Sequence, residues 1–183
     1  MSNQIKNDSG VKQVIFVVET NEVAKTDTRY IIKLWDQLYG TNNNDIKRQF
    51  VYMDGKSKYN RNTIKTRIKS YLKANSDGEN YVVYCFDTDK IDTVTRDLNN
   101  IKEYKKYCDD NGYKFVWFCY DIEMVFIGRS VPDSEKEYES KKFARIKDII
   151  DIRKLQNGND IDSMHKEKSN IYSILREIHK INK

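Results

Sequence analysis

Acidic residues follow four short apolar stretches of the sequence, and this placement is the feature that most suggests chemistry. The clearest case is YVVYCFDTDK, residues 81–90, where an aromatic and β-branched run ends in two aspartates separated by one threonine. If the four runs are parallel strands of one sheet, their carboxyl ends share an edge and the acids converge there. The acids are Glu19, Asp54, Asp87 with Asp89, and Asp121 with Glu123.

Converging carboxylates repel one another unless a cation lies between them. Clusters of oxygen ligands suit Mg²⁺ or Mn²⁺, hard ions that prefer carboxylates and water. The spacing therefore predicts that Asp87 and Asp89 share a metal ion and that Glu19 holds it from the neighbouring strand. For any single acid the alternative is structural, because aspartate also caps helices and favours turns. Asp54, in MDGKS, is typical of a turn.

Strands and helices alternate along the first two thirds of the chain, and this order predicts the fold. The runs QVIFVVE, RQFVYMD, YVVYCFD and KFVWFCYD are short and continuously apolar, as strands covered on both faces are. Apolar residues at helical spacing predict helices over 28–39, 60–74 and 94–108. We therefore expect an α/β fold with a mainly parallel, doubly wound sheet and helices on both faces, in which 14–18 and 81–86 are neighbouring inner strands.

The last third of the sequence is charged and has high helical propensity. The stretches FARIKDIIDIRKL, 143–155, and SNIYSILREIHKI, 169–181, each show an amphipathic stripe, and the turn-like NGND lies between them. We expect two helices here, packed on the sheet or on each other. The chain then divides into a polar tail over 1–12, an α/β core over 13–130 and C-terminal helices over 131–183.

Composition is typical of a cytoplasmic protein. With 183 residues, 38% of them hydrophobic, the chain is long enough for one domain with a substantial core. Three cysteines, two of them inside apolar runs, indicate reduced and buried thiols. The polar N-terminus lacks the apolar core of a signal peptide, and no apolar run approaches the roughly 18 residues of a membrane helix. We expect no contact with a membrane.

The charge of the chain permits contact with nucleic acid without requiring it. The formal net charge is +5, with 33 basic and 28 acidic residues mixed along the sequence. Basic residues crowd the predicted helix within YNRNTIKTRIKSYLK, and four of them are candidates to contact a phosphate backbone: Arg61, Lys65, Arg67 and Lys69. A solvated helix face explains the same pattern almost equally well.

Two motifs resemble those of the Toprim domain of topoisomerases, primases and OLD-type nucleases. That domain has a glutamate at the end of its first strand and a DxD pair after a later strand, positions that Glu19, Asp87 and Asp89 match. More narrowly, ETNEVAKTDTRYI is similar to the first motif of RloB-like Toprim proteins, with Lys25 opening its Lys-Thr-acid stretch. The chain departs from the family at Thr20, where Toprim proteins usually have glycine.

A third segment, YDIEMVFIG, resembles the later part of the family in which a glutamate begins a helix, here Glu123. The resemblance implies a Toprim-like fold and metal-dependent hydrolysis of phosphodiester bonds in DNA or RNA, in a bacterial or phage defence system. Glu19, Asp87 and Asp89 would then be ligands of Mg²⁺ or Mn²⁺. Glu123 would complete a second metal position or act as a general base, and Lys25 would stabilise charge in the transition state.

Three functions stay open at this point. A nuclease would act on nucleic acid, with room for a protein partner such as an ATPase of a defence system. A non-catalytic module that binds nucleic acid or protein, on a Toprim-like or flavodoxin-like fold, would use its acids only in caps and turns. A receiver-like phosphoacceptor domain needs an acidic pair after the first strand and a lysine after the last, which VVETNE and FCYDIE do not supply. The oligomeric state also stays open.

Overall fold

Strands and helices alternate along the protein, whose computed structural model describes residues 10–41, 44–90, 93–158, 160, 164 and 167–180. Two short segments, η1 (Lys56–Lys58) and η2 (Ile152–Leu155), are 3-10 helices. In chain order the elements are β1 (Gly10–Val18), α1 (Thr26–Tyr39), β2 (Ile46–Tyr52), η1 (Lys56–Lys58), α2 (Asn62–Ala74), β3 (Gly78–Asp87), α3 (Thr95–Asp110), β4 (Lys114–Phe118), α4 (Ile122–Ile127), α5 (Asp133–Arg145), η2 (Ile152–Leu155) and α6 (Ile171–Lys180).

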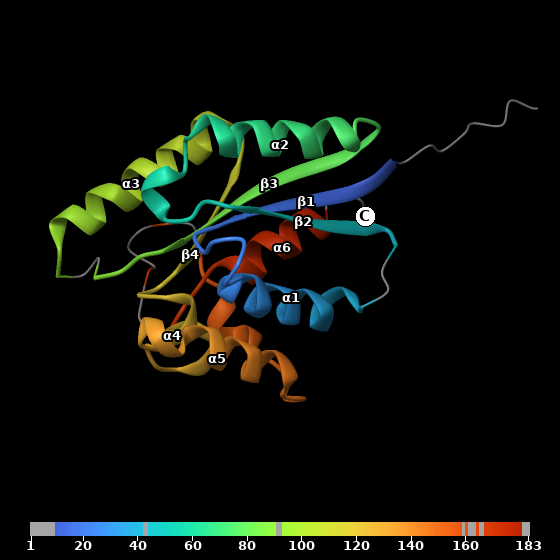
Figure 1. The fold of residues 1–183 in the computed structure, drawn as a ribbon. Helices are drawn as coiled ribbons and strands as arrows, with labels where there is room; N and C mark the ends of the chain where they lie inside the picture. The colour runs from blue at the N-terminus through green and yellow to red at the C-terminus, as the bar shows by residue number, and fades with distance from the viewer. Residues whose placement is uncertain are drawn as a thin grey trace, which may run out of the picture.

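The four strands form one parallel sheet in the order β2-β1-β3-β4. The inner strands β1 and β3 are neighbours, with Val14 opposite Tyr81 and Phe16 opposite Val83. The predicted α/β fold with a parallel sheet is therefore confirmed, as is the inner position of these two strands. Because all four strands run in the same direction, their carboxyl ends lie at one edge of the sheet (Figure 1).

Helices cover both faces of the sheet, as predicted. Helices α2 and α3 lie on one face, and α1, α4, α5 and α6 lie on the other, where α5 packs mainly on α1 (Figure 1). Ile15 and Tyr84 belong to the core of the first face, and Phe16 and Cys85 belong to the core of the second. Alternate residues of β1 and β3 thus enter two different apolar cores. Burial on both faces explains why the central parts of the inner strands β1 and β3 are continuously apolar in the sequence, whereas the edge strand β2 contains Lys47, Arg48 and Gln49.

The helix predicted over 143–155 is wrong, and the one predicted over 169–181 is confirmed as α6. The first C-terminal helix, α5, begins ten residues earlier than predicted and ends at Arg145. Ile146 then takes extended backbone angles, and residues 146–151 form neither helix nor strand. Side chains of α1 hold this segment: the Lys33 ammonium donates to Ile146 O at 2.8 Å, and Gln37 Oε1 accepts from Ile150 N at 2.7 Å.

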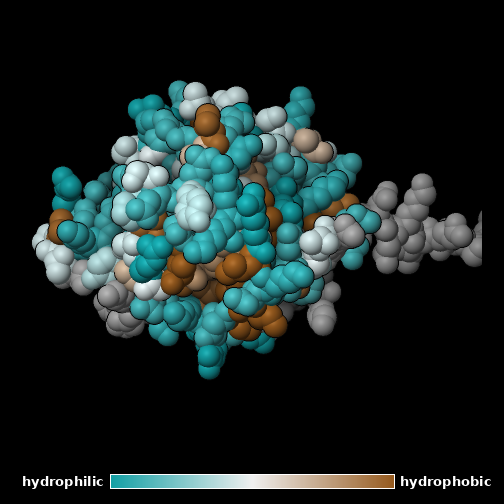
Figure 2. Space-filling model, turned by 60° about the horizontal axis from the view of Figure 1, so that its bottom comes forward, coloured by the Kyte–Doolittle hydropathy of each residue, from teal (hydrophilic) through white to brown (hydrophobic). Residues whose placement is uncertain are grey.

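A groove of about 220 Å³ lies beside this irregular segment, lined in part by Lys33, Phe126, Phe143 and Ile149. Figure 2 views the molecule from the side of α4 and α5 and shows apolar surface among hydrophilic residues. Of the Ile149 side chain, 84% is exposed. The predicted amphipathic stripe therefore borders a surface groove.

Two further expectations concern the ends of the core and the membrane. β1 begins at Gly10, inside the stretch predicted as a polar tail, whose residues 1–9 lie outside the described part. Within the described ranges, none of the helices has the length and apolar character needed to span a bilayer.

Candidate functional site

The ends of β1 and β3 bring two of the predicted metal ligands together. The Asp87 backbone N–H donates to Glu19 Oε1 at 2.7 Å. This hydrogen bond ties the carboxylate at the end of β1 to the last residue of β3, across neighbouring strands of the sheet. The two strand ends therefore lie together as predicted, and Glu19 contacts the backbone of Asp87.

A third carboxylate, that of Asp27, lies close to this pair. Asp27 is in the first turn of α1, and its side chain accepts hydrogen bonds from Thr20 N and Thr26 Oγ1, both at 3.1 Å. Burial raises the pKa of Asp27, and these hydrogen bonds offset the rise only in part. The loop between β1 and α1 thus folds back so that Asp27 faces the strand ends.

Burial and mutual repulsion raise the pKa values of the strand-end acids. Burial raises the pKa of Glu19 to about 8, with smaller contributions from the charges of Asp27 and Asp89, and Lys56 opposes the rise. Burial also raises the pKa of Asp87 well above its usual range, and the negative charges of Glu19, Asp27 and Glu123 raise it further. These carboxylates therefore carry protons at pH values where an exposed carboxylate is fully ionised.

Asp87 and Asp89 do not point to the same place, because the chain turns between them. Thr88 is fully buried and its N–H donates to Phe118 O at 2.9 Å, while Asp89 has a positive φ of 51° and donates to Tyr120 O at 2.9 Å. The Asp89 carboxylate is 44% exposed and forms an ion pair with Lys56. Asp89 thus lies at the outer side of the site, and Asp87 lies at its inner side.

Lys56, which was not among the residues predicted from the sequence, places an ammonium group beside these acids. Its Nζ donates to the Asp89 carboxylate and to Asp87 O, the latter at 3.2 Å. Burial alone would lower the pKa of Lys56, but the charges of Glu19 and Asp89 outweigh burial and raise it. The ammonium is therefore charged throughout the physiological range of pH.

Glu123 enters the site from the start of α4, where the sequence predicted that a helix begins. Its side chain is 1% exposed, and neither carboxylate oxygen accepts a hydrogen bond within the described part of the chain. Burial raises the pKa of Glu123 to about 7 even though Lys136 of α5 lies 3.7 Å away and lowers it. Asp121 instead caps α4, since its Oδ1 accepts from Met124 N at 2.6 Å. Glu123 is therefore the functional candidate of this segment.

Lys25 does not lie against the carboxylates. Its side chain is exposed at the N-cap of α1, and among the described residues it forms no hydrogen bond or ion pair. The lysines that flank the acids are Lys56 on the β2 side and Lys136 on the α5 side. The role predicted for Lys25 stays a prediction.

The donor chemistry of this edge fits a hard divalent ion, although the side chains have not converged on one point. Within the described ranges, no three aspartate, glutamate, histidine or cysteine side chains are arranged so that they could hold a metal ion. Glu19 and Asp87 are nevertheless adjacent and destabilise one another as anions. Both carboxylate oxygens of Glu123 are buried, and neither has a hydrogen-bond partner among the residues that the structure describes. Carboxylate oxygens in such a state are ligands that Mg²⁺ and Mn²⁺ prefer.

The basic helix predicted from the sequence is α2, and three of its four candidate residues are free of ion pairs among the described residues. Arg61, Lys65 and Lys69 are exposed, whereas Arg67 pairs with Glu22 in the loop after β1, at 3.2 Å. Arg61 immediately precedes α2 and lies near Asp54, the acid that follows β2. The N-terminal end of α2 is therefore the end nearest to the carboxyl edge of the sheet. The positive charges extend from that edge along the helix.

Three residues of the site were missed or given no role: Asp27, Lys56 and Lys136. Asp27 stands in the Lys-Thr-acid stretch, so the motif itself contained a signal. Lys56 follows the Asp54-Gly55 turn after a strand, and a lysine at that place is a weaker signal of the same kind. Lys136 lies in a charged helix far along the chain, where the sequence offers no sign of its contact with Glu123.

Comparisons of the chain with protein-family models, with curated proteins and with solved structures found no match. The resemblance to Toprim proteins therefore rests on the motifs around the strand ends and stays a prediction. What the structure contributes is the arrangement of acids and lysines at the carboxyl edge of a parallel sheet.

Proposed function

We propose that this protein is a metal-dependent nuclease of the Toprim type, which hydrolyses phosphodiester bonds of DNA or RNA with Mg²⁺ or Mn²⁺. The observation that supports this most strongly is the group of carboxylates at the carboxyl edge of the sheet, where Glu19 Oε1 lies 2.7 Å from Asp87 N and where burial first, and the neighbouring carboxylates second, raise the pKa values. Such a group is unfavourable in the absence of a cation, and it persists in folds where the acids have a function. The reduced cysteines expected from the sequence support activity in the cytoplasm, and the resemblance to Toprim proteins supports a bacterial or phage defence system as its setting.

Each acid has a distinct role in this proposal. Glu19 and Asp87 would hold the ion from adjacent strands, and Asp89 would join them from the outer side. When bound, the ion would neutralise the charge of the phosphodiester and activate water for attack. Glu123 would serve as the general base, because its pKa of about 7 lets it accept a proton at neutral pH.

The lysines would act on the negative charge of the substrate. Lys136 lies against Glu123 and is placed to stabilise charge that develops in the transition state, a role that the motif gives to Lys25. Both residues are candidates, and their substitution separates them. Loss of Lys136 should lower the cleavage rate more than loss of Lys25, because, of these two lysines, Lys136 is the one whose ammonium contacts an acid of the site among the described residues.

Nucleic acid would reach the site along α2. The exposed residues Arg61, Lys65 and Lys69 would contact phosphates without reading the sequence of bases. Arg67 could join them only by leaving its ion pair with Glu22, which is solvent-exposed and therefore weak. A protein partner, such as an ATPase of a defence system, is part of the same proposal.

The test is cleavage of single-stranded DNA, double-stranded DNA and RNA by the purified protein in Mg²⁺, Mn²⁺ or EDTA. Asp87→Asn removes one proposed ligand at nearly constant volume, and the Asp87 backbone hydrogen bond to Glu19 does not depend on the side chain. We expect the rate to fall by at least about a hundredfold, with binding much less affected. Asp54→Asn is the matched control, since Asp54 also follows a strand but pairs with Lys58 at the surface. Cleavage that persists in Asp87→Asn would contradict the proposal.

A second function, a non-catalytic module that binds nucleic acid or protein, is favoured by one specific observation. The Asp89 carboxylate already pairs with Lys56, so part of the negative charge is neutralised within the protein. Such a site could be stable without any ion. Binding of DNA or RNA without cleavage in either metal would favour this function over the nuclease.

A further inference from the structure

The connection between β2 and η1 fixes where the Lys56 side chain can reach. Gly55 N–H donates to Glu19 O at 2.9 Å, so the turn after β2 is attached to the end of β1. Asp54 and Gly55 have positive φ angles of 55° and 105°, which reverse the direction of the chain. The angle at Gly55 is one that favours glycine. Lys56 follows directly, and its side chain crosses the end of β1 to reach Asp87 O at the end of β3.

We propose that Lys56 is the resident counter-cation of the site. In the metal-free protein its ammonium occupies the position among the three predicted ligands that a divalent ion would take, and it leaves this position when the ion binds. The inference rests on the proposed function, because it needs the metal site to be real. It goes further in naming the group that competes with the ion.

Geometry and charge support this role for Lys56. Its ammonium donates to the Asp89 carboxylate and to the backbone carbonyl oxygen of Asp87, the latter at 3.2 Å. Among the nearby charges, that of Glu19 acts on it most strongly. A divalent ion bound to these carboxylates would lie close to the Lys56 ammonium, and two cations at short distance in a partly buried site repel one another strongly. The engagement of Asp89 by Lys56 also explains why the carboxylates of Asp87 and Asp89 do not face a common point.

Displacement would give Lys56 a second task. An ammonium group that leaves the carboxylates stays near the carboxyl edge of the sheet, because the attachment of Gly55 to Glu19 is through the backbone. It would then have three donors available for an anionic phosphate oxygen. Lys56 would thus pass from the acids of the protein to the phosphate of the substrate.

The experiment is a titration of the protein with Mn²⁺ alone at neutral pH, with binding measured by calorimetry or by the electron paramagnetic resonance of free Mn²⁺. Lys56→Gln removes the resident charge, and we expect the Kd for Mn²⁺ to fall about tenfold or more. Lys58→Gln is the matched control, because Lys58 lies in the same 3-10 turn and forms an ion pair with the exposed Asp54, outside the proposed site. Its Kd should stay within about twofold of the wild-type value.

The possible outcomes separate this inference from the proposed function. Binding by the wild type with an unchanged or weaker affinity in folded Lys56→Gln overturns the inference and leaves the nuclease proposal intact. Binding by Lys56→Gln alone supports it. An absence of Mn²⁺ binding in both proteins overturns the metal site, and the inference falls with it.

Thermal melting covers the case in which Lys56→Gln folds poorly. Without its resident cation the variant leaves the acids uncompensated, so Mn²⁺ should raise its melting temperature more than that of the wild type. Recovery of cooperative unfolding on addition of Mn²⁺ would support the inference. A destabilised variant that Mn²⁺ does not stabilise would overturn it.

Discussion

Glu123 lies in the first turn of α4 with 1% of its side chain exposed, and among the described residues neither of its carboxylate oxygens accepts a hydrogen bond. Burial opposes its ionisation more strongly than the nearby Lys136 favours it, and the pKa of Glu123 rises to about 7. The unfolded chain would titrate near the ordinary value of 4.5. Between these two values the folded protein holds a proton that the unfolded protein releases.

This difference predicts how stability depends on pH. Because the folded pKa is the higher one, the contribution of Glu123 is fully present below about pH 4.5 and is lost as the pH rises through about 7. For the metal-free protein we expect the free energy of unfolding to fall by about 2–3 kcal/mol from this group between pH 5 and pH 8. Glu123→Gln cannot titrate and should flatten the decline, as measured by urea denaturation in EDTA.

The matched control for this experiment is Glu135→Gln, which removes an exposed carboxylate from α5 next to Lys136. It should leave the pH dependence as it is in the wild type. Glu19 and Asp87 contribute with the same sign, since burial raises their pKa values too. The slope of Glu123→Gln should therefore be smaller than that of the wild type without reaching zero, and an unchanged slope would show that Glu123 is ionised in the folded protein.

At the scale of elements, the outer edge of β4 is closed by residues 168–170, not by another strand. Ser169 bridges to Phe118 in antiparallel fashion, and Cys119 N–H donates to Lys168 O at 3.0 Å. The side chain of Asn170 continues the pattern, because its Oδ1 accepts from Trp117 N at 3.0 Å and its Nδ2 donates to Phe115 O at 2.9 Å. A single amide thus imitates a strand partner and protects the edge.

Asn170→Ala should therefore destabilise the protein strongly. The substitution leaves a buried N–H and a buried C=O of β4 without these partners, and we expect a loss of about 2–4 kcal/mol in the free energy of unfolding. Asn111→Ala is the control, since Asn111 also donates to a backbone carbonyl, Tyr107 O at 2.8 Å, but at the exposed end of α3. Its loss should be about 1 kcal/mol or less. Equal losses in chemical denaturation would rule out the role given to Asn170.

The elements that the sequence predicted well are those whose burial is decided by their own residues. The run YVVYCFD is apolar on both faces and forms the greater part of β3, with side chains in both cores. The segment after Arg145 behaves differently, although its isoleucines have helical spacing. Lys33 and Gln37 of α1 bind its backbone groups and hold it in an irregular conformation, and these contacts join residues more than a hundred positions apart. Local periodicity carries no information about such partners.

The candidate site also contains residues whose positions could be predicted from the sequence and residues whose positions could not. Glu19 and Asp87 could be paired from the sequence because parallel strands bring their carboxyl ends together, and the structure places them in contact. Asp89 could not be placed, since its direction depends on a backbone turn at Thr88 and on the ammonium of Lys56. Side chains that arrive from loops and from distant helices lie beyond the reach of strand-end spacing.

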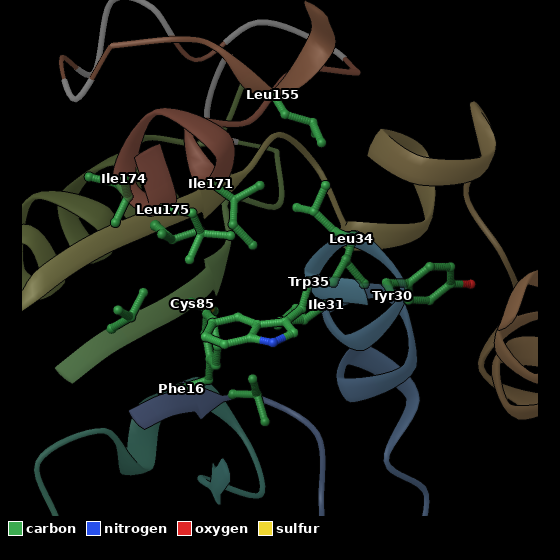
Figure 3. Packing of buried hydrophobic residues seen from close by; sticks show 14 of the residues in the cluster. Phe16, Tyr30, Ile31, Leu34, Trp35, Cys85, Leu155, Ile171, Ile174 and Leu175 are labelled. Carbon is green, nitrogen blue, oxygen red and sulfur yellow. The ribbon is translucent and has the colours of Figure 1, made fainter. Parts of the chain in front are cut away.

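At the scale of the whole molecule, the C-terminal elements complete one of the two cores. Leu155 of η2 and Leu175 of α6 belong to the same buried cluster as Phe16 of β1 and Leu34 of α1 (Figure 3). Phe143 of α5 is a further member of this cluster. This half of the core contains residues from both ends of the described chain. Helices that share a core with the central sheet should unfold together with it.

Leu175→Ala tests this cooperativity. Leu175 is fully buried against the sheet side of α6, and its truncation should lower the free energy of unfolding by about 3 kcal/mol through lost burial and the cavity left behind. Ile149→Ala removes a similar aliphatic side chain that is 84% exposed, and it should change stability by less than about 0.5 kcal/mol. In both variants, circular dichroism and tryptophan fluorescence should report one common transition, because Trp35 and Trp117 lie in the two different cores. Loss of helical signal in Leu175→Ala before any change in fluorescence would show that the C-terminal helices unfold as a separate unit.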